Sequence, residues 1–389
     1  MQELGAKRSV IRELFEYGKK RKNEIGEDNV YDFSLGNPSV PAPEEVNEAI
    51  NTLVTKESSV LLHGYTSAQG DLSVRSAIAS YVNETYGETI TPDCIYMSVG
   101  AAAALTSTLT ALVSPGEEVI VLAPYFPEYK VFIERCGGVV KEVPCDAELQ
   151  PDIAAIEEAI NEKTAAIIVN SPNNPTGAVY GEERIIALSN LLRRCEEKYN
   201  HPIYLISDEP YRELVYDGLT VPYLPKYYDD TVVCYSYSKS LSIPGERIGY
   251  VLVCPRCKSF AEVYQAVCGA GRALGFVCAP SLLQKILPYC LGKTSDISVY
   301  DRNRKLLLDK LTEYGFELIR PQGAFYLFIK SPSGDATEFC ERAKKYEILI
   351  VPSDDFGCAG YARLAYCVTT EQIERALPAF LALSKSYKE

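Results

Sequence analysis

The stretch TVVCYSYSKSLSIPGERIGY, residues 231–250, is an apolar, β-branched run followed at once by hydroxyl side chains, one lysine and one arginine. Its first five residues predict a buried strand, and the following Pro244-Gly245 predicts that any helix after the strand is short. Two similar strands come earlier: residues 165–169 lead into NSPNNPTG (170–177), and residues 203–207 lead into DEPY (208–211). Because ligands of open α/β sheets bind beyond the carboxyl ends of strands, these three segments are the first candidates for a functional site.

Short apolar runs alternate with helical stretches from about residue 90 to residue 280. The apolar runs predict seven strands, at residues 95–99, 118–122, 139–143, 165–169, 203–207, 231–235 and 248–253. Helices are predicted between or after them, at residues 101–113, 153–161, 182–199 and 259–270. This alternation indicates an α/β fold with a mainly parallel sheet flanked by helices.

The pattern changes near Pro280, where helical stretches at 281–291, 299–314 and 371–386 combine with strands at 325–329 and 363–367. These elements indicate a smaller α+β domain. An amphipathic helix over residues 7–22 and a strand at 31–35 are expected to pack with it. We therefore predict a large domain over residues 46–284 and a small, discontinuous domain from residues 1–45 and 285–389.

The composition indicates which partners the protein is expected to bind and in which cell compartment it is expected to lie. A net charge of −13 disfavours nucleic acid and anionic membrane surfaces. No run of about 20 apolar residues and no apolar N-terminal segment occurs, so neither a membrane span nor a secretory signal is expected. The 13 cysteines are typical of reduced thiols in a cytoplasmic protein. Cys254 and Cys257 form one CxxC, but nothing completes a zinc site around them, so no metal is expected.

The chemistry of the site is suggested by Lys239, which follows a buried strand closely. Burial is expected to lower the pKa of its amine, and a neutral amine is a nucleophile towards carbonyl carbon. Singly, the neighbouring segments also have structural explanations, because Asn/Pro/Gly clusters form turns and an aspartate after a strand often caps a helix. Their occurrence at three consecutive strand ends favours a site.

Residues 236–250, with Ser-x-Ser-Lys, Pro-Gly and Arg-Ile-Gly, resemble the cofactor-lysine signature of the class I/II aminotransferases, in the aspartate aminotransferase-like, fold-type I superfamily. Asn174-Pro-Thr-Gly177 and Asp208-Glu-Pro-Tyr211 are similar to its other two signatures, in the expected order, and the resemblance spans residues 36–363. It implies an aminotransferase that uses pyridoxal 5′-phosphate to move an amino group between an L-amino acid and a 2-oxo acid. The reaction would be ping-pong, by way of pyridoxamine phosphate.

The resemblance assigns catalytic roles to three residues. Lys239 would hold the cofactor as a Schiff base and shuttle a proton from Cα to C4′. Asp208 would pair with the pyridine nitrogen and keep it protonated, and such an ion pair is worth roughly 4 kcal/mol at an effective dielectric near 20. Tyr211, together with Asn174, would hydrogen-bond the ring oxygen O3′.

The remaining cofactor contacts are implied in the same way. Phe126 would stack on the ring, although an ordinary core aromatic is the alternative. Tyr65 would reach the phosphate of a partner subunit, which implies a homodimer with shared sites. The phosphate would be bound by hydroxyls, an arginine and the backbone at a helix start: Ser236, Ser238, Arg247, Gly100, Ala101 and Ala102.

Substrate binding is implied for Arg363, whose planar guanidinium suits an α-carboxylate, with Gly36 and Asn174 lining the same pocket. Specificity stays open. The turn after Gly100 lacks a lysine that some aspartate-specific relatives use. Arg272 lies near the place where other relatives have a distal arginine donated by the partner subunit, but a surface charge explains it equally well. A dicarboxylate, aspartate-type substrate is therefore one option.

Three alternatives remain at this point. Carbon–sulfur β-lyases and cyclopropane-carboxylate synthases share the lysine and the arginines, and a lyase would release pyruvate and ammonia without an acceptor. Ser236-x-x-Lys239, with Lys293-Thr-Ser, also matches a serine acyl-hydrolase motif, but Pro244-Gly245 interrupts the long helix that this motif needs. A non-catalytic regulator would carry a DNA-binding domain, for which the roughly 30 residues before Tyr31 are too few.

Overall fold

The computed structural model describes residues 2–6 and 10–388 of the chain. They divide into two compact units. Unit 1 comprises the described residues up to 40, residues 173–178 and the described residues from 296 onward, and unit 2 comprises residues 41–172 and 179–295. The domain limits given above, at 45/46 and 284/285, stay a prediction.

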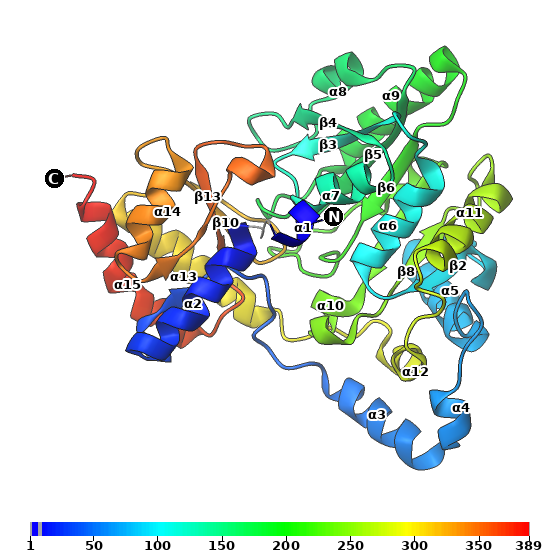
Figure 1. Ribbon diagram of the computed structural model, residues 1–389, viewed down its shortest axis with the longest axis horizontal. Coiled ribbons are helices and arrows are strands. Elements are labelled where there is room, and N and C mark those ends of the chain that lie inside the picture. Colours follow the sequence, from blue (N-terminus) through cyan, green and yellow to red (C-terminus); the bar gives the residue numbers. More distant parts are fainter. Residues whose placement is uncertain (1, 7–9, 389) are drawn as a thin grey trace. The chain divides into compact units, whose positions relative to one another are not determined.

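Unit 2 is built on a seven-stranded sheet with the order β2-β8-β7-β6-β5-β3-β4 (Figure 1). Its strands are β2 (Ile95–Ser98), β3 (Glu118–Ala123), β4 (Val139–Pro144), β5 (Thr164–Asn170), β6 (Tyr204–Asp208), β7 (Thr231–Ser236) and β8 (Gly249–Val253). The pairs from β4 through β7 are parallel, whereas β8 is antiparallel to both β7 and β2. The predicted α/β class is therefore confirmed, with a mixed sheet. The link from β7 to β8 contains only α10 (Tyr237–Ser240) and one 3₁₀ turn, without the long crossover helix that usually joins parallel strands.

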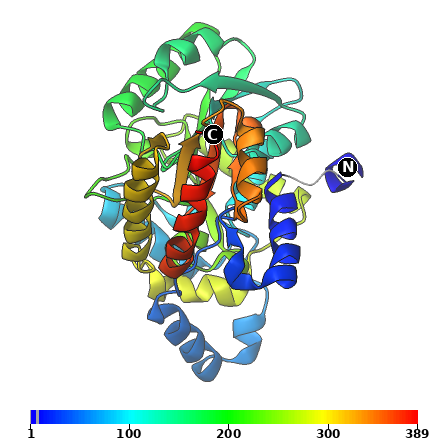
Figure 2. The same cartoon turned by 90° about the vertical axis from the view of Figure 1, so that its left-hand side faces the viewer.

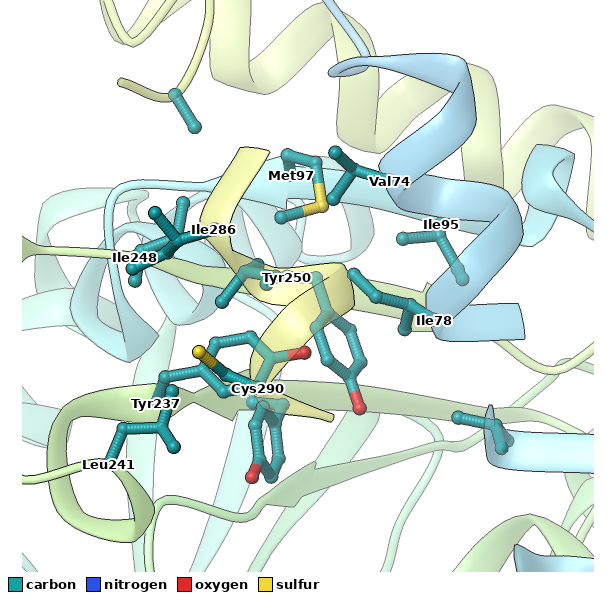
Figure 3. Close-up of a cluster of buried hydrophobic side chains, with 14 of the residues drawn as sticks. Val74, Ile78, Ile95, Met97, Tyr237, Leu241, Ile248, Tyr250, Ile286 and Cys290 are labelled. Carbon is teal, nitrogen blue, oxygen red and sulfur yellow. The ribbon is translucent and has the colours of Figure 1, made fainter. Parts of the chain in front are cut away.

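Helices cover both faces of this sheet, because successive strand residues point to opposite sides. Tyr96 and Cys234 belong to a core with α6 (Ala101–Leu112), α7 (Glu128–Arg135) and α11 (Phe260–Ala273). Ile95 and Met97 belong to the opposite core, with α3 (Glu44–Lys56), α5 (Leu72–Tyr86) and α12 (Ser281–Cys290) (Figure 3). The unit is completed by α4 (Ser59–His63), α8 (Ile153–Ala159) and α9 (Glu182–Tyr199).

Unit 1 contains an antiparallel sheet with the order β12-β13-β10-β9 and a separate parallel pair, β1 with β11. The strands are β1 (Tyr31–Asp32), β9 (Leu318–Ile319), β10 (Tyr326–Lys330), β11 (Ile348–Leu349), β12 (Val351–Pro352) and β13 (Tyr361–Ala365). The helices are α2 (Val10–Ile25), α13 (Ser298–Tyr314), α14 (Ala336–Lys344) and α15 (Thr370–Lys385). α15 lies between α13 and α14 and packs against both (Figure 2).

The sequence-based elements agree with these bounds except near the N-terminus. The predicted strand at 31–35 is only two residues long, and the predicted helix over 7–22 begins at Val10 and extends to Ile25, with residues 7–9 outside the described part. Ahead of them, α1 spans Gln2–Ala6. Among residues 2–6 and 10–388, no helix combines the length and apolar character needed to cross a bilayer.

Candidate active site

The carboxyl ends of β5, β6 and β7 bring polar side chains into one row. Asn170 pairs in register with Asp208, and Asp208 pairs with Cys234, two residues before the end of β7 at Ser236. Ser236 pairs with Gly249 of β8, which pairs in turn with Ser98 at the end of β2. Lys239 lies on α10, directly after β7, and is half-buried. The register therefore collects the amide of Asn170 and the predicted carboxylate, hydroxyl and amine groups at the carboxyl ends of these strands.

Asp208 is the most unusual group in this row. Its side chain is 4% exposed, and its Oδ2 accepts hydrogen bonds from the hydroxyl of Tyr129 and, at 3.4 Å, from Nδ2 of Asn170. Its Oδ1 has no hydrogen-bond partner within residues 2–6 and 10–388. Burial raises the pKa of the Asp208 carboxyl to about 7; the hydrogen bond from Tyr129 opposes this shift, and the Glu209 carboxylate adds to it. A buried carboxylate with one oxygen left over fits a cationic partner such as a protonated pyridine nitrogen.

Another group of polar residues lies where β2 ends and α6 begins. We call it the anion cradle, and it consists of Gly100, Ser236, Ser238 and Arg247 with the first backbone amides of α6. Gly100 has a φ of 84°, and a Cβ there would come within 2.8 Å of Nη2 of Arg247. The first backbone N–H groups of α6 have no partner within the helix, so they are available to an anion. Ser236 Oγ and Ser238 Oγ lie 2.8 Å apart, and Nη1 of Arg247 lies 3.5 Å from Ser238 Oγ. Hydroxyls, amides and a guanidinium thus converge in a geometry that suits a phosphate.

Arg247 itself has a φ of 53°, a left-handed conformation that non-glycine residues rarely adopt. The conformation turns the chain from the 3₁₀ turn at Pro244–Glu246 into β8. Nη1 of Arg247 donates to the carbonyl of Pro244 at 3.0 Å. Strained backbone of this kind often occurs at functional sites, where the surrounding structure holds it in place.

Two aromatic residues of the sequence-based site also lie in unit 2. Tyr211 is 5% exposed and follows Asp208 by one turn. The Phe126 ring is partly buried and meets the Tyr129 ring edge-on, with centroids 5.7 Å apart. Burial first, then Asp208 and Tyr211, raise the pKa of Tyr129 well above its ordinary value. Tyr129 therefore remains a neutral hydroxyl that donates to Asp208.

The residues predicted to bind substrate, Arg363, Gly36 and Asn174, lie in unit 1. Arg363 on β13 is 2% exposed, and its guanidinium donates to Oδ1 of Asn174 at 3.1 Å and to the carbonyl of Ser34 at 2.6 Å. Its Cζ lies 4.7 Å from the ring centroid of Tyr326 and 5.2 Å from that of Phe356. A Cβ at Gly36 would lie 2.1 Å from the Tyr326 hydroxyl, so only glycine fits there without movement. These contacts fix the plane of the Arg363 guanidinium.

Tyr65 and Arg272 are surface residues of unit 2. The Tyr65 side chain is 96% exposed. Arg272 lies in the last turn of α11 and is exposed as well. Neither belongs to the row at the strand ends or to the anion cradle.

Sequence reasoning missed Tyr129 and Asn170 as partners of Asp208, and Ser34 and Tyr326 as partners of Arg363. Asn170 could have been found, because it ends a strand next to the one that ends at Asp208. Tyr129 follows Phe126 by one helical turn, which is only a weak signal. The contacts of Arg363 depend on strand pairing within unit 1, which the sequence does not encode locally.

The acyl-hydrolase alternative fails on local structure. Ser236 is the last residue of β7, and α10 after it is only four residues long. The long core helix that the Ser-x-x-Lys motif requires is therefore not formed at this position. Cys254 and Cys257 are both buried, and burial raises the pKa of the Cys254 thiol to about 11.

Comparison with known proteins agrees with this geometry. The model of the family described as "Aminotransferase class I and II" matches residues 28–380. The aspartate/prephenate aminotransferase of Thermus thermophilus is 32% identical over 355 residues, which cover 90% of this chain and 89% of that protein. A crystal structure of an amino transferase from Eubacterium rectale has a TM-score of 0.98 and 55% identity, covering 100% of this chain and 98% of that one. The aspartate aminotransferase of T. thermophilus with maleate has a TM-score of 0.87 and 28% identity, covering 98% and 99% of the two chains.

These relatives do not favour the lyase alternative. The fold-type I architecture and the aminotransferase activity that the strand-end signatures imply are both confirmed. The cofactor follows from the family, whose members use pyridoxal phosphate, and the buried carboxylate and anion cradle fit that group. The chain belongs to the class I and II aminotransferases.

Proposed function

We propose that this aminotransferase accepts dicarboxylic amino acids, with aspartate as a donor, and that the residues at the strand ends of unit 2 bind and use pyridoxal phosphate. The observation that carries the proposal is the buried Asp208 with its unpartnered oxygen, in the row of strand ends that leads to the anion cradle. The aspartate/prephenate aminotransferase relative, and the neighbouring structure with the dicarboxylate maleate, support the substrate class.

The bound cofactor would supply an electron sink for the charge that develops at the substrate Cα. Lys239 would hold the cofactor covalently and then move the proton at Cα as a general base. Asp208 would keep the ring nitrogen protonated, with Tyr129 and Asn170 holding the carboxylate in place. Tyr211 would donate to O3′, and Phe126 would cover one face of the ring. The phosphate would be bound by Ser236, Ser238, Arg247 and the amides at Gly100, Ala101 and Ala102.

Arg363 would bind the α-carboxylate of the amino acid through its planar fork. We expect Arg363→Lys to lower kcat/KM about 10- to 100-fold for amino and 2-oxo acids alike, because an ammonium group cannot make two parallel hydrogen bonds. Cofactor affinity should change much less than kcat/KM, because the residues proposed to bind the phosphate do not include Arg363. Steady-state kinetics checks this, with Arg375→Lys, which alters the exposed ion pair with Asp28, as control. An unchanged kcat/KM would exclude Arg363 from substrate binding.

The substrate class can be tested by mixing the purified holoenzyme with single amino acids and recording the cofactor absorbance. We expect amino transfer from aspartate and glutamate to change the spectrum. If Arg272 binds the distal carboxylate, Arg272→Ala should weaken aspartate about 10- to 100-fold and leave neutral donors unchanged. Arg135→Ala, at the exposed end of α7, is the matched control.

Other outcomes of this experiment would contradict the proposal at different levels. Amino transfer only from neutral or aromatic donors would make Arg272 a surface charge and overturn the dicarboxylate assignment. Pyruvate and ammonia formed without an acceptor would indicate a lyase. A protein with no cofactor band, even after pyridoxal phosphate is added, would refute the proposed cofactor site.

We infer a homodimer in which Tyr65 reaches the partner subunit's cofactor phosphate. Its side chain is 96% exposed, and it follows α4, on which Val60 and Leu61 are 81% and 68% exposed. Such an apolar cluster is typical of a protein interface. We expect Tyr65→Ala to weaken pyridoxal phosphate about tenfold, through loss of one hydrogen bond to a charged group.

A mixed dimer separates shared from unshared sites. When Tyr65→Ala and Lys239→Ala chains are co-expressed and assayed at a pyridoxal phosphate concentration too low to fill the Tyr65→Ala site, a shared arrangement creates one site with both residues intact, and activity should return. If each Tyr65 serves its own chain, the mixed dimer contains no intact site and activity stays low. Sedimentation of the wild-type protein as a monomer would also rule out the inference.

A further inference from the structure

A buried ion pair is formed by the chain neighbours of Asp208 and Tyr211. Glu209 is 2% exposed and Arg212 is 6% exposed. Nε of Arg212 donates to Oε2 of Glu209 at 2.5 Å, and Nη2 of Arg212 lies against Oε1, so the contact is two-pronged. Ser207 Oγ also donates to Oε1 of Glu209, at 2.6 Å.

The turn after β6 presents its residues to two different environments. Asp208 accepts hydrogen bonds from Tyr129 and Asn170. Tyr211 contributes to the raised pKa of the same Tyr129. Arg212 instead lies against stacked aromatic rings, with its Cζ 5.2 Å from the centroid of Tyr86 and 4.9 Å from that of Tyr223. These two rings are parallel within 10° at a centroid distance of 4.2 Å. The guanidinium therefore lies close to this pair of rings as well as to the carboxylate of Glu209.

The same buried region touches the residue that follows Lys239. Glu213 accepts a hydrogen bond from the Tyr235 hydroxyl at 2.8 Å, and that hydroxyl lies 3.2 Å from Oγ of Ser240. Arg212, Glu213, Tyr223, Tyr235 and Ser240 border one cavity of about 40 Å³. The turn after β6 and the lysine helix α10 are thus held from behind by one polar cluster.

We propose that Glu209 and Arg212 form a clamp that fixes the turn carrying Asp208 and Tyr211, and that they act as positioning residues for the reaction. The clamp spans residues 209 and 212, so it closes the turn in which Tyr211 lies. The inference rests on the roles proposed above for Asp208 and Tyr211.

Arginine is required in this position for physical reasons. Its planar fork can contact both oxygens of Glu209 while the guanidinium stays within about 5 Å of the ring centroids of Tyr86 and Tyr223, which a lysine ammonium cannot do. The positive charge of Arg212 also matters, because it pairs with the Glu209 carboxylate, whose negative charge raises the pKa of Asp208. A weakened clamp should therefore change the electrostatics at the ring nitrogen as well as the geometry of the turn.

The experiment compares Arg212→Lys and Glu209→Gln holoenzymes with the wild type. Arg212→Lys should fold, because the ammonium keeps the charge and finds acceptors in Glu209 and at Glu213 Oε2 and Tyr223, which border the same cavity. We expect kcat to fall about 10- to 100-fold in both variants, because a displacement near 1 Å at the site has effects of this size. The pH midpoint of the cofactor absorbance should move by about one unit.

Leu188→Ala serves as the matched control, since Leu188 is buried on α9, a helix that carries none of the proposed site residues. It should lower Tm without moving kcat or the spectral midpoint. If Arg212→Lys and Glu209→Gln behave like Leu188→Ala, the pair is only structural and the inference is overturned. Asp208→Asn and Tyr211→Phe are measured in parallel. If these two leave the spectrum unchanged, the proposed cofactor roles fail; if they change it while the clamp variants do not, only the clamp fails.

Discussion

Replacing Lys239 with alanine should reduce transamination by at least about 10⁴-fold. The same amine is proposed to hold the cofactor and to move the proton at Cα, and general acid–base catalysis alone contributes about 10²- to 10⁴-fold. Lys239 is half-buried on α10. Among the described residues, it is the lysine that follows one of the strand ends of the proposed site, so no other lysine there could replace it. Single-turnover absorbance measurements with a good donor would report the loss directly.

The control for this experiment is Lys163→Ala, an exposed lysine just before β5, at the opposite end of the sheet. It should leave the rate unchanged. Small primary amines added to Lys239→Ala should restore part of the rate, because they can accept the proton in place of the missing side chain. A rate within tenfold of wild type in Lys239→Ala would remove the lysine from the mechanism.

Replacing Asp208 with asparagine should lower kcat/KM by up to about 10³-fold. Asparagine keeps the shape but not the charge that holds a proton on the ring nitrogen, and a close ion pair is worth roughly 4 kcal/mol at an effective dielectric near 20. A loss of that size corresponds to about three powers of ten in rate. Asp229→Asn, which removes an exposed carboxylate paired with Arg256, is the control. A kcat/KM within about tenfold of wild type would argue against the ion pair.

Asp208 also predicts a pH dependence of stability for the cofactor-free protein. Burial raises the pKa of its carboxyl to about 7 in the folded chain, against about 3.9 when unfolded. Between these values the folded state binds more protons than the unfolded state, so the free energy of unfolding falls as pH rises from about 4 to about 7. The full difference is on the order of 4 kcal/mol. Bound cofactor with a protonated ring nitrogen would remove this loss of stability, because the positive charge stabilises the ionised Asp208 carboxylate.

Tm measured across this pH range, with and without pyridoxal phosphate, checks the expectation. The stabilisation by the cofactor should grow as pH rises through the window, and the cofactor-free Asp208→Asn protein should lack this component of the slope. Equal slopes for cofactor-free wild type and Asp208→Asn would mean that Asp208 titrates normally. Tyr129→Phe should extend the fall in stability to higher pH, because the Tyr129 hydroxyl lowers the pKa of Asp208 and its loss lets that pKa rise further.

The local sequence determined the strands of unit 2, because six of the seven are buried and have apolar cores, and even β4 at the edge of the sheet begins with two valines. For the same reason it placed Lys239, Asp208 and Ser236 at strand ends, and it marked Gly100 at the start of α6. These features depend on residues that are neighbours in the chain. Periodicity and turn chemistry are sufficient to read them.

The tertiary structure alone decided which groups meet. The antiparallel setting of β8 and β2 brings Gly249 and Gly100 together at the anion cradle, where a Cβ on Gly249 would lie 3.3 Å from Cα of Gly100. Tyr129 reaches Asp208 across 79 positions of sequence, and Arg363 reaches Ser34 across 329. The ion pair of Glu209 and Arg212 is close in sequence, but its burial against Tyr86 depends on where α5 ends. Contacts of this kind follow from strand order and register, which are set by the packing of the whole unit, so no local pattern in the sequence could specify them.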